Sequence, residues 1–362
     1  MENILNNLIF LPFLVAFLVT AAITPISIKI LKKLKIVDDP KVRKHPAVIH
    51  TKPIPRGGGI PLFLGALLAG IIFLPINQIT VAIYIAAFIS LVVGALDDKF
   101  DISPYVRFIV NILCAVIVVA AGVSVNFITN PLGGILYLNE IKLPIEFLGI
   151  GMVITLSHVV AVLWIVWVMN MLNWSKGVDG QMPGIVAISA IFIGILSLRF
   201  GTGDDLTQTT TSLSFIISGA AIGFLIYNFH PAKIFPGYGA TAIYLLLAVV
   251  SILSSAKLAT AILVMGVPLA DGAFTIGRRI LTGHSPFWHD KKHLHHLLLS
   301  SGLGQRRIAL FYWLISAIFG SLSLVLSSRG KIFAIIMLVI IVGGTLLFLN
   351  YLIRKKNGTQ SI

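Results

Sequence analysis

Long apolar runs separated by short polar connections extend along nearly the whole chain. The runs begin near Leu8, Gly58, Thr80, Tyr105, Gly149, Pro183, Ser212, Ala240, Leu258, Ile308 and Lys331. Most contain about 20 residues, the length that an α-helix needs to cross the hydrocarbon core of a bilayer. The pattern predicts an all-α, polytopic integral membrane protein with about eleven transmembrane helices. The longest outer connection, over about 123–148, is expected to form a hairpin or an interfacial turn.

The composition supports a membrane protein that forms one domain. Of the 362 residues, 57% are hydrophobic and 11% are charged, which is more apolar sequence than a soluble core could bury. One transmembrane domain is expected over 1–362, with a motif-bearing core over 37–299 and two last spans over about 308–353. Cys114 is the single cysteine and lies within an apolar run, which excludes a disulfide framework and a cysteine-based metal site.

Basic residues are distributed unevenly over the connections between the runs. If the N-terminus lies outside the cell, all but five of the 27 Lys and Arg residues fall on the cytoplasmic side. The exceptions are Lys142, Arg199, Lys257, Arg329 and Lys331. By the positive-inside rule, this asymmetry predicts an outside N-terminus and a cytoplasmic C-terminus. The net charge of +14 then reflects membrane topology, and no nucleic-acid partner is expected.

Polar residues that could carry chemistry gather in five stretches on the predicted cytoplasmic side. The first contains Arg43, His50 and Arg56 beside a glycine triplet. Backbone N–H groups next to guanidinium groups suit phosphate binding, and a basic loop that holds anionic lipid headgroups is the alternative. Asp97 and Asp98 stand where an apolar run ends and are expected on a polar loop. Two adjacent carboxylates suit Mg²⁺ coordination or a general base, with a capped helix end as the alternative.

Two further stretches carry amides and an aromatic ring. Asn170 and Asn173 are three residues apart, so they share one face of a helix at the end of a span, and Asp179 follows after a break. These amides either bind a ligand or satisfy the open carbonyls of the helix end. Asn228 and Phe235 belong to a short loop whose ring can stack on a base, with an interfacial aromatic anchor as the alternative.

The last stretch is strongly cationic and rich in histidine. It contains Arg278, Arg279, His293, His295 and His296. A phosphate or diphosphate cradle fits this charge. Zinc is disfavoured, because no cysteine is available and the histidines lack the i, i+4 spacing that places two ligands on one helix face.

The order of these motifs resembles that of a known family. The succession of RK, HTKPIPRGGG, DD, NMLNWSKGVDG, NFHPAKIF and HLHH is similar to that of bacterial polyprenyl-phosphate N-acetylhexosamine-1-phosphate transferases, within glycosyl transferase family 4. The resemblance spans about 38–299, and the HLHH form is more similar to the branch that uses UDP-N-acetylglucosamine. It implies transfer of N-acetylhexosamine-1-phosphate from a UDP-sugar to undecaprenyl or another polyprenyl phosphate. UMP would be released, and cell-envelope glycan synthesis would begin at the cytoplasmic face of the bacterial inner membrane.

The same resemblance implies partners, a cofactor and residue roles. The implied partners are a UDP-N-acetylhexosamine, a polyprenyl phosphate and the lipid bilayer, and the implied cofactor is Mg²⁺. The resemblance is also compatible with a homodimer. Asp97 would deprotonate or position the lipid phosphate, and Asp97 and Asp98 would hold Mg²⁺. Asp179 would hydrogen-bond uracil, Phe235 would stack on it and Asn228 would contact the nucleoside. The arginines and the HLHH histidines would bind phosphates, which completes a predicted substrate site with His50, Asn170 and Asn173.

Two positions depart from the pattern of that family. Lys176 replaces the first acid of the family's DGxDG segment, and Tyr238 stands where the family's FxGDxGS loop has a metal-ligand Asp. Mg²⁺ held by two carboxylates alone would bind weakly. Three alternatives follow. Lys176 acts as a catalytic group that replaces part of the metal's charge, or the metal is bound at a different position. In the third alternative the protein is a catalytically silent relative that binds lipid phosphate or UDP-sugar. A transporter is less favoured, because the ionisable groups lie at span ends.

Overall fold

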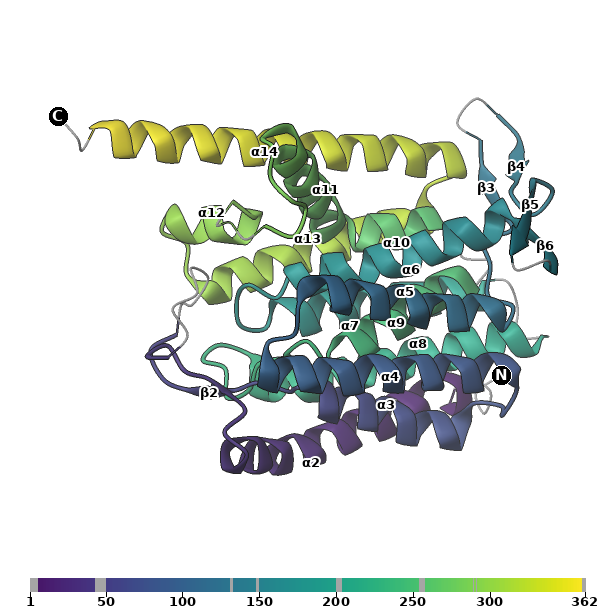
Figure 1. Ribbon diagram of the computed structural model, residues 1–362, viewed down its shortest axis with the longest axis horizontal. Helices are drawn as coiled ribbons and strands as arrows, with labels where there is room; N and C mark the ends of the chain where they lie inside the picture. Colours follow the sequence, from purple (N-terminus) through teal and green to yellow (C-terminus); the bar gives the residue numbers. More distant parts are fainter. Residues whose placement is uncertain are drawn as a thin grey trace.

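Helices make up most of the computed structural model, which describes residues 6–42, 50–130, 133–147, 150–199, 204–253, 258–288, 290 and 292–359. The helices are η1 (Asn6–Phe10), α2 (Leu11–Lys33), α3 (Gly59–Phe73), α4 (Gln78–Phe100), α5 (Pro104–Ala120), α6 (Leu156–Trp174), α7 (Gln181–Leu198), α8 (Asp205–Asn228), α9 (Thr241–Leu253), α10 (Leu258–Val264), α11 (Gly266–Leu281), α12 (Leu294–Ser300), α13 (Gln305–Val325) and α14 (Ser328–Thr359). Most of them run side by side along one direction (Figure 1). A helix satisfies its own backbone hydrogen bonds, which is why apolar segments adopt it where water is excluded.

Seven of the described helices are long and apolar enough to cross a membrane, and the number rises to eight if the bent pair α10–α11 is one span. The apolar helices α3, α5 and α9 are shorter, with 15, 17 and 13 residues. Each predicted apolar run therefore contains a helix or a helix pair, and the protein has the helices of a multi-pass membrane protein. The total of eleven spans stays a prediction.

Short antiparallel strands interrupt the helical pattern. The strands are β1 (Val37–Asp38), β2 (Ile54–Pro55), β3 (Phe127–Thr129), β4 (Ile135–Tyr137), β5 (Lys142–Phe147) and β6 (Ile150–Thr155), paired as β1–β2, β3–β4 and β5–β6. The hairpin expected over 123–148 is confirmed. The helix expected from Gly149 starts later, because β6 occupies the β-branched segment before Leu156.

The span expected from Leu258 is broken rather than straight. α10 and α11 meet at an angle of 84°, and α11 runs across the bundle in Figure 1. Pro268 has no N–H to donate to the carbonyl oxygen of Val264, so the helical hydrogen-bond pattern lacks one bond across the break, which favours a bend there. The break turns α11 so that its polar C-terminal half reaches the candidate site described below.

α8 lies among α2, α3, α7 and α9, and small residues allow close approach of its neighbours. A Cβ at Gly219 would lie 2.2 Å from the carbonyl oxygen of Phe13, and one at Gly223 would lie 2.5 Å from that of Phe17. Small residues at such contacts are typical of membrane helices, whose association depends on close packing. Exposed apolar side chains cover the outer faces of α13 and α14, as expected for helices that face lipid.

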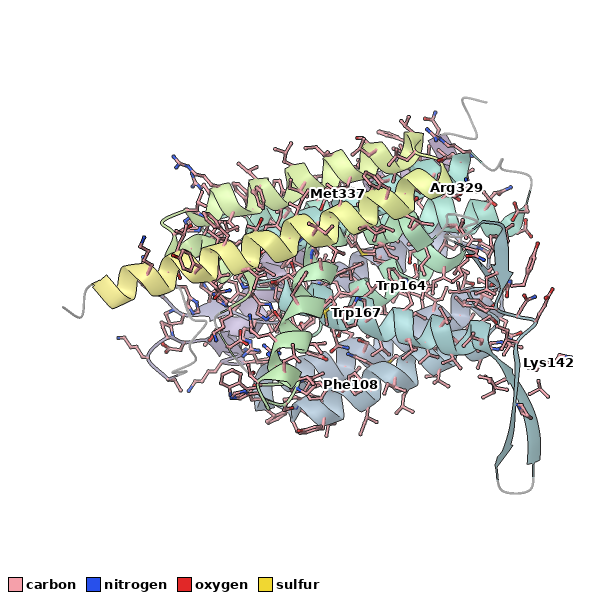
Figure 2. The ribbon with its side chains drawn as sticks, turned by 90° about the horizontal axis from the view of Figure 1, so that it is seen from above. Phe108, Lys142, Trp164, Trp167, Arg329 and Met337 are labelled. Atoms are coloured by element: carbon pink, nitrogen blue, oxygen red, sulfur yellow. The ribbon has the colours of Figure 1, made fainter. Side chains whose placement is uncertain are left out.

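The two ends of the bundle differ in character. Figure 1 shows β3–β6 at one end, and β2, α12 and the C-terminal part of α14 at the other. α2 begins at the hairpin end and α14 finishes at the opposite end, so the chain enters and leaves the bundle on opposite sides. Lys142 and Arg329, two of the basic residues predicted to lie outside the cell, lie toward the hairpin end in Figure 2.

Candidate active site

Residues from all five polar stretches meet around one cavity at the end of the bundle opposite the hairpins. The cavity has a volume of about 330 Å³. Its wall includes the predicted site residues His50, Arg56, Asp97, Asn170, Asn173, Lys176, Asp179, Asn228, Phe235, Arg279, His293, His295 and His296. Arg43 lies outside the described residues. The arrangement brings together stretches that are far apart in the sequence, as the order of motifs led us to expect.

The two adjacent carboxylates belong to a helix rather than to the loop expected from the sequence. α4 continues through Asp97 and Asp98 to Phe100, and Asp101 ends the helix in the left-handed conformation, with φ 54°. Both carboxylates are buried. Arg107 donates from Nη1 to both oxygens of Asp97, at 3.1 and 3.0 Å. Helical packing thus holds Asp97 against the next helix, α5, instead of leaving it in solvent.

Asp98 points to the loop between α8 and α9, just behind the cavity wall. Its Oδ1 accepts a hydrogen bond from the backbone N–H of Tyr238 at 2.8 Å and lies 3.5 Å from Nη2 of Arg56. Gly237 has a φ of +66°, and a Cβ there would lie 2.1 Å from Oδ2 of Asp98. Glycine is therefore needed at this position, because both the backbone conformation and the close carboxylate exclude a side chain.

Tyr238 occupies the space between two cations. Cζ of Arg107 lies 4.8 Å from the centre of its ring, and Nζ of Lys176 lies 5.8 Å from it. Nζ of Lys176 donates to the carbonyl oxygen of Gly237 at 2.8 Å, and Nδ2 of Asn111 donates to the Tyr238 hydroxyl at 3.1 Å. The ring is thus held at its backbone and at its hydroxyl, and its faces attract the two cations.

Burial changes the proton affinity of the two residues that depart from the family pattern. It lowers the pKa of Lys176 to about 8, against the opposing attraction of Asp98 and with a contribution in the same direction from Arg56. Burial raises the pKa of Tyr238 to about 12. At neutral pH, Lys176 is therefore mainly an ammonium and Tyr238 a neutral phenol.

The donor set around Asp97 and Asp98 does not fit a resident Mg²⁺. No group of three His, Cys, Asp or Glu that could hold a metal ion occurs in the part of the chain that the structure describes. The two carboxylates face arginines, and Lys176 lies beside them. Mg²⁺ requires oxygen ligands in near-octahedral geometry, whereas these oxygens already accept hydrogen bonds from cations and from backbone N–H groups.

The histidine stretch forms a second wall of the cavity, and an acid from α11 holds it in place. Asp271 accepts from the backbone N–H of Leu294 at 3.0 Å and from Nδ1 of His293 at 2.8 Å. His295 stacks on His293 with ring centres 5.6 Å apart, and its Nε2 lies 1.9 Å from where a Cβ of Gly177 would be. Burial and the neighbouring histidines lower the pKa of His295 well below its usual range, so it is neutral.

The paired arginines of α11 take different directions. Asp290 accepts from Nη2 of Arg278 at 2.7 Å and from Nε of Arg279 at 3.2 Å. Arg279 lines the cavity above the ring of Trp174. Arg278, which was predicted to bind substrate, instead borders a separate cavity of about 230 Å³ between Lys292 and α14.

Two further predicted residues, Asp179 and Asn228, form a hydrogen-bonding end of the cavity. Oδ2 of Asp179 accepts from the backbone N–H of Ala232 at 3.0 Å and pairs with Nδ1 of His230 at 2.8 Å. The carboxamide of Asn228 bonds within the protein at both ends: Oδ1 accepts from Gly180 N–H at 3.1 Å, and Nδ2 donates to the carbonyl oxygen of Ile234. Asn228 therefore ties the 180 turn to the 234 loop, which positions Asp179 at the cavity.

An aromatic loop and the segment before α3 complete the wall. Phe287 packs edge-on against Phe108 and Tyr105 of α5, with ring centres 5.4 and 5.3 Å apart. Phe235 bonds through its backbone N–H to Pro55, which aligns it with Arg56, and its ring lies 5.1 Å from His50. The ring of Phe235 thus lines the cavity beside Arg56.

Three residues that matter to this geometry were not among the predicted site residues. Arg107 lies ten positions after Asp97, near the start of the next helix, α5. A cation just after the turn that joins α4 to α5 could have indicated its pairing with Asp97. Asp271 is an acid within an apolar run, which is costly unless a partner such as His293 is present. Trp174 gave no signal beyond its aromatic character.

Comparisons with known proteins relate the chain to a described family. A family model described as glycosyl transferase family 4 matches residues 80–255. The chain is similar to the probable undecaprenyl-phosphate N-acetylglucosaminyl 1-phosphate transferase of Bacillus subtilis, with 34% identity over 87% of this chain and 84% of that protein. It is 29% identical to the decaprenyl-phosphate N-acetylglucosaminephosphotransferase of Mycobacterium leprae, over 85% of this chain and 83% of the relative. It is also 29% identical to the undecaprenyl-phosphate alpha-N-acetylglucosaminyl 1-phosphate transferase of Haemophilus influenzae, over 95% and 92% of the two chains.

Proposed function

The chain belongs to glycosyl transferase family 4, and from this premise we propose that it transfers N-acetylglucosamine-1-phosphate from UDP-N-acetylglucosamine to a polyprenyl phosphate. The observation that carries the proposal is the single cavity in which carboxylates, cations and a hydrogen-bonding end converge. A lipid phosphate oxygen attacks the sugar-bound phosphorus, and the bond from that phosphorus to the uridine phosphate breaks. UMP then leaves with the electron pair of that bond.

The charges in the cavity support this reaction, because phosphoryl transfer depends mainly on positioning and on electrostatic stabilisation. Arg56, Arg107 and Lys176 provide positive charge near the carboxylates for the diphosphate. Asp97, buried beside Arg107, accepts a proton from the lipid phosphate or orients it. Arg279 and the histidine wall supply further donors for phosphate oxygens on the opposite side.

The other end of the cavity suits the uridine. Asp179 has its carboxylate at the cavity wall, where it accepts hydrogen bonds from His230 and from the chain. A carboxylate at this position can accept from the N–H of uracil, and the ring of Phe235 offers a face for stacking. The two halves of a UDP-sugar therefore find chemically matched ends within one cavity.

The cavity is proposed to face the cytoplasm of a bacterial cell, where UDP-sugars are made. Support comes from the basic residues, nearly all of which belong to the segments predicted to be cytoplasmic. Lys142 and Arg329, which lie toward the opposite end, belong to the few exceptions (Figure 2). A lipid phosphate in the inner leaflet would then reach the cavity from the side of the bilayer.

The proposal is tested with purified protein, labelled UDP-N-acetylglucosamine and undecaprenyl phosphate. Formation of labelled lipid together with UMP is expected. Asp97→Asn and Asp98→Asn should each lower the rate about a hundredfold or more, because each alters the charge beside the reacting phosphates. Asp205→Asn, at the far end of the bundle, is the matched control and should keep full activity. Binding of the nucleotide sugar without any turnover would refute the proposal and favour a silent relative.

A further inference from the structure

Positive charge exceeds negative charge where the cavity meets α4. Arg56 lies 3.5 Å from Asp98, and Arg107 lies 3.0 Å from Asp97. Lys176 is a third cation, and it interacts electrostatically with both acids and both arginines. Among the described residues of this cluster, two acids therefore face three cations. This balance is the opposite of the one that attracts a divalent cation, which needs an excess of negative ligands.

The cations are held by fixed contacts rather than by solvent. Arg107 is bound by both oxygens of Asp97 and lies over the Tyr238 ring. Lys176 donates to the Gly237 carbonyl and lies 5.8 Å from the centre of the same ring. The ring itself cannot turn freely, because Asp98 holds its backbone and Asn111 holds its hydroxyl. The cations are thus positioned before a ligand arrives, which is how fixed charges stabilise a phosphate with little reorganisation.

We propose that this site holds the diphosphate of its substrate with Arg56, Arg107 and Lys176, arranged around the Tyr238 ring, and that no resident divalent ion takes part. Tyr238 and Asn111 are positioning residues, because they act through the two cations that the ring orients. The inference rests on the proposed function for the identity of the diphosphate. It extends that function by assigning the charge that a metal would provide to three cationic side chains, two of which lie over one aromatic ring.

The first measurement concerns the ion itself and does not depend on turnover. Mn²⁺, a paramagnetic substitute for Mg²⁺, is added to the purified protein without nucleotide, and its free signal is followed by electron paramagnetic resonance. The free signal should remain undiminished. The double variant Lys176→Asp with Tyr238→Asp is the positive control, because two added carboxylates beside Asp98 should create a site that removes Mn²⁺ from solution. Mn²⁺ bound to the natural protein in equal amount, and lost in Asp98→Asn, would overturn the inference.

The second measurement is binding of UDP-N-acetylglucosamine by calorimetry, in EDTA and in excess Mg²⁺. The dissociation constant should be the same in both buffers and should rise about tenfold or more in Lys176→Ala. Lys99→Ala removes an exposed lysine near the same helix end and should bind like the natural protein. Tyr238→Leu removes the ring that orients the two cations and should weaken binding as Lys176→Ala does. Thermal unfolding of each variant shows that the fold is retained.

The outcomes separate this inference from the proposed function. Metal-independent, Lys176-dependent binding without sugar-phosphate transfer would refute the function and leave the cation site standing. Transfer that occurs only with Mg²⁺, together with a loss of nucleotide affinity in EDTA of more than about tenfold, would refute the cation site and leave the function standing. Unchanged binding in Lys176→Ala would also refute the cation site.

Discussion

Lys176 provides the sharpest test of the site, because its burial couples substrate binding to pH. With a pKa of about 8, its protonated fraction falls from about nine-tenths at pH 7 to about one-tenth at pH 9. If a bound diphosphate keeps the ammonium charged, affinity for UDP-N-acetylglucosamine should fall about tenfold over this interval. The charged and titratable groups that face the ammonium are Arg56, Asp97, Asp98, Arg107 and Tyr238.

The stability of the fold should respond in the opposite direction. The pKa of Lys176 is lower in the folded protein than its ordinary value of 10.5, so the unfolded chain holds the proton more tightly. This group therefore lowers stability below about pH 8 and ceases to do so as the pH rises toward 10.5. The difference corresponds to at most about 3 kcal/mol, since the side chain retains some contact with water. Binding weakens over a pH range in which this contribution to stability grows.

Calorimetry of UDP-N-acetylglucosamine binding at about pH 7 and pH 9 checks this reasoning. The diphosphate of this ligand carries no proton to lose in the interval, whereas the uracil N–H begins to ionise at its alkaline end, so the natural protein must be compared with a variant that cannot lose charge. Lys176→Arg is that variant, because a guanidinium remains charged throughout, and it should show a clearly smaller decline than the natural protein. Lys99→Arg is the control and should retain the full decline. Equal affinity at both pH values, or an equal decline in Lys176→Arg, would show that the ammonium does not hold the substrate.

Three further predictions address the walls and the orientation of the cavity. Gly177→Ala places a methyl group 1.9 Å from Nε2 of His295. It should therefore displace that ring, lower the unfolding free energy by about 1–3 kcal/mol and reduce activity. An unchanged thermal midpoint would contradict this prediction. Asp271→Asn removes the charge beside His293 and should raise the KM for the nucleotide sugar about tenfold while the protein still folds. Unchanged kinetics would show that Asp271 is not a positioning residue. Lys142→Cys should react with a membrane-impermeant thiol reagent on intact cells, and its protection would reverse the assigned topology.

The structure brings most of the predicted residues together, as the order of the motifs led us to expect, and their roles in binding and catalysis stay predictions. All but three of the predicted residues line one cavity. Asp98 lies directly behind the wall, Arg278 faces another cavity, and Arg43 is outside the described residues. The helix end at Asp97 was misplaced because an acid pair is a strong loop signal locally, yet Arg107 and Arg56 compensate its charge and allow α4 to continue.

The sequence by itself determined the positions of the apolar helices and the grouping of polar stretches. Both are local properties: a run of about 20 apolar residues forms a helix in a membrane whatever surrounds it. The tertiary structure alone decided which charges meet. It bent α10 away from α11, brought Asp271 to His293, and placed the Tyr238 ring between Arg107 and Lys176. Such pairings depend on the packing of separate helices, and the energy of a charge depends on the partners that packing supplies.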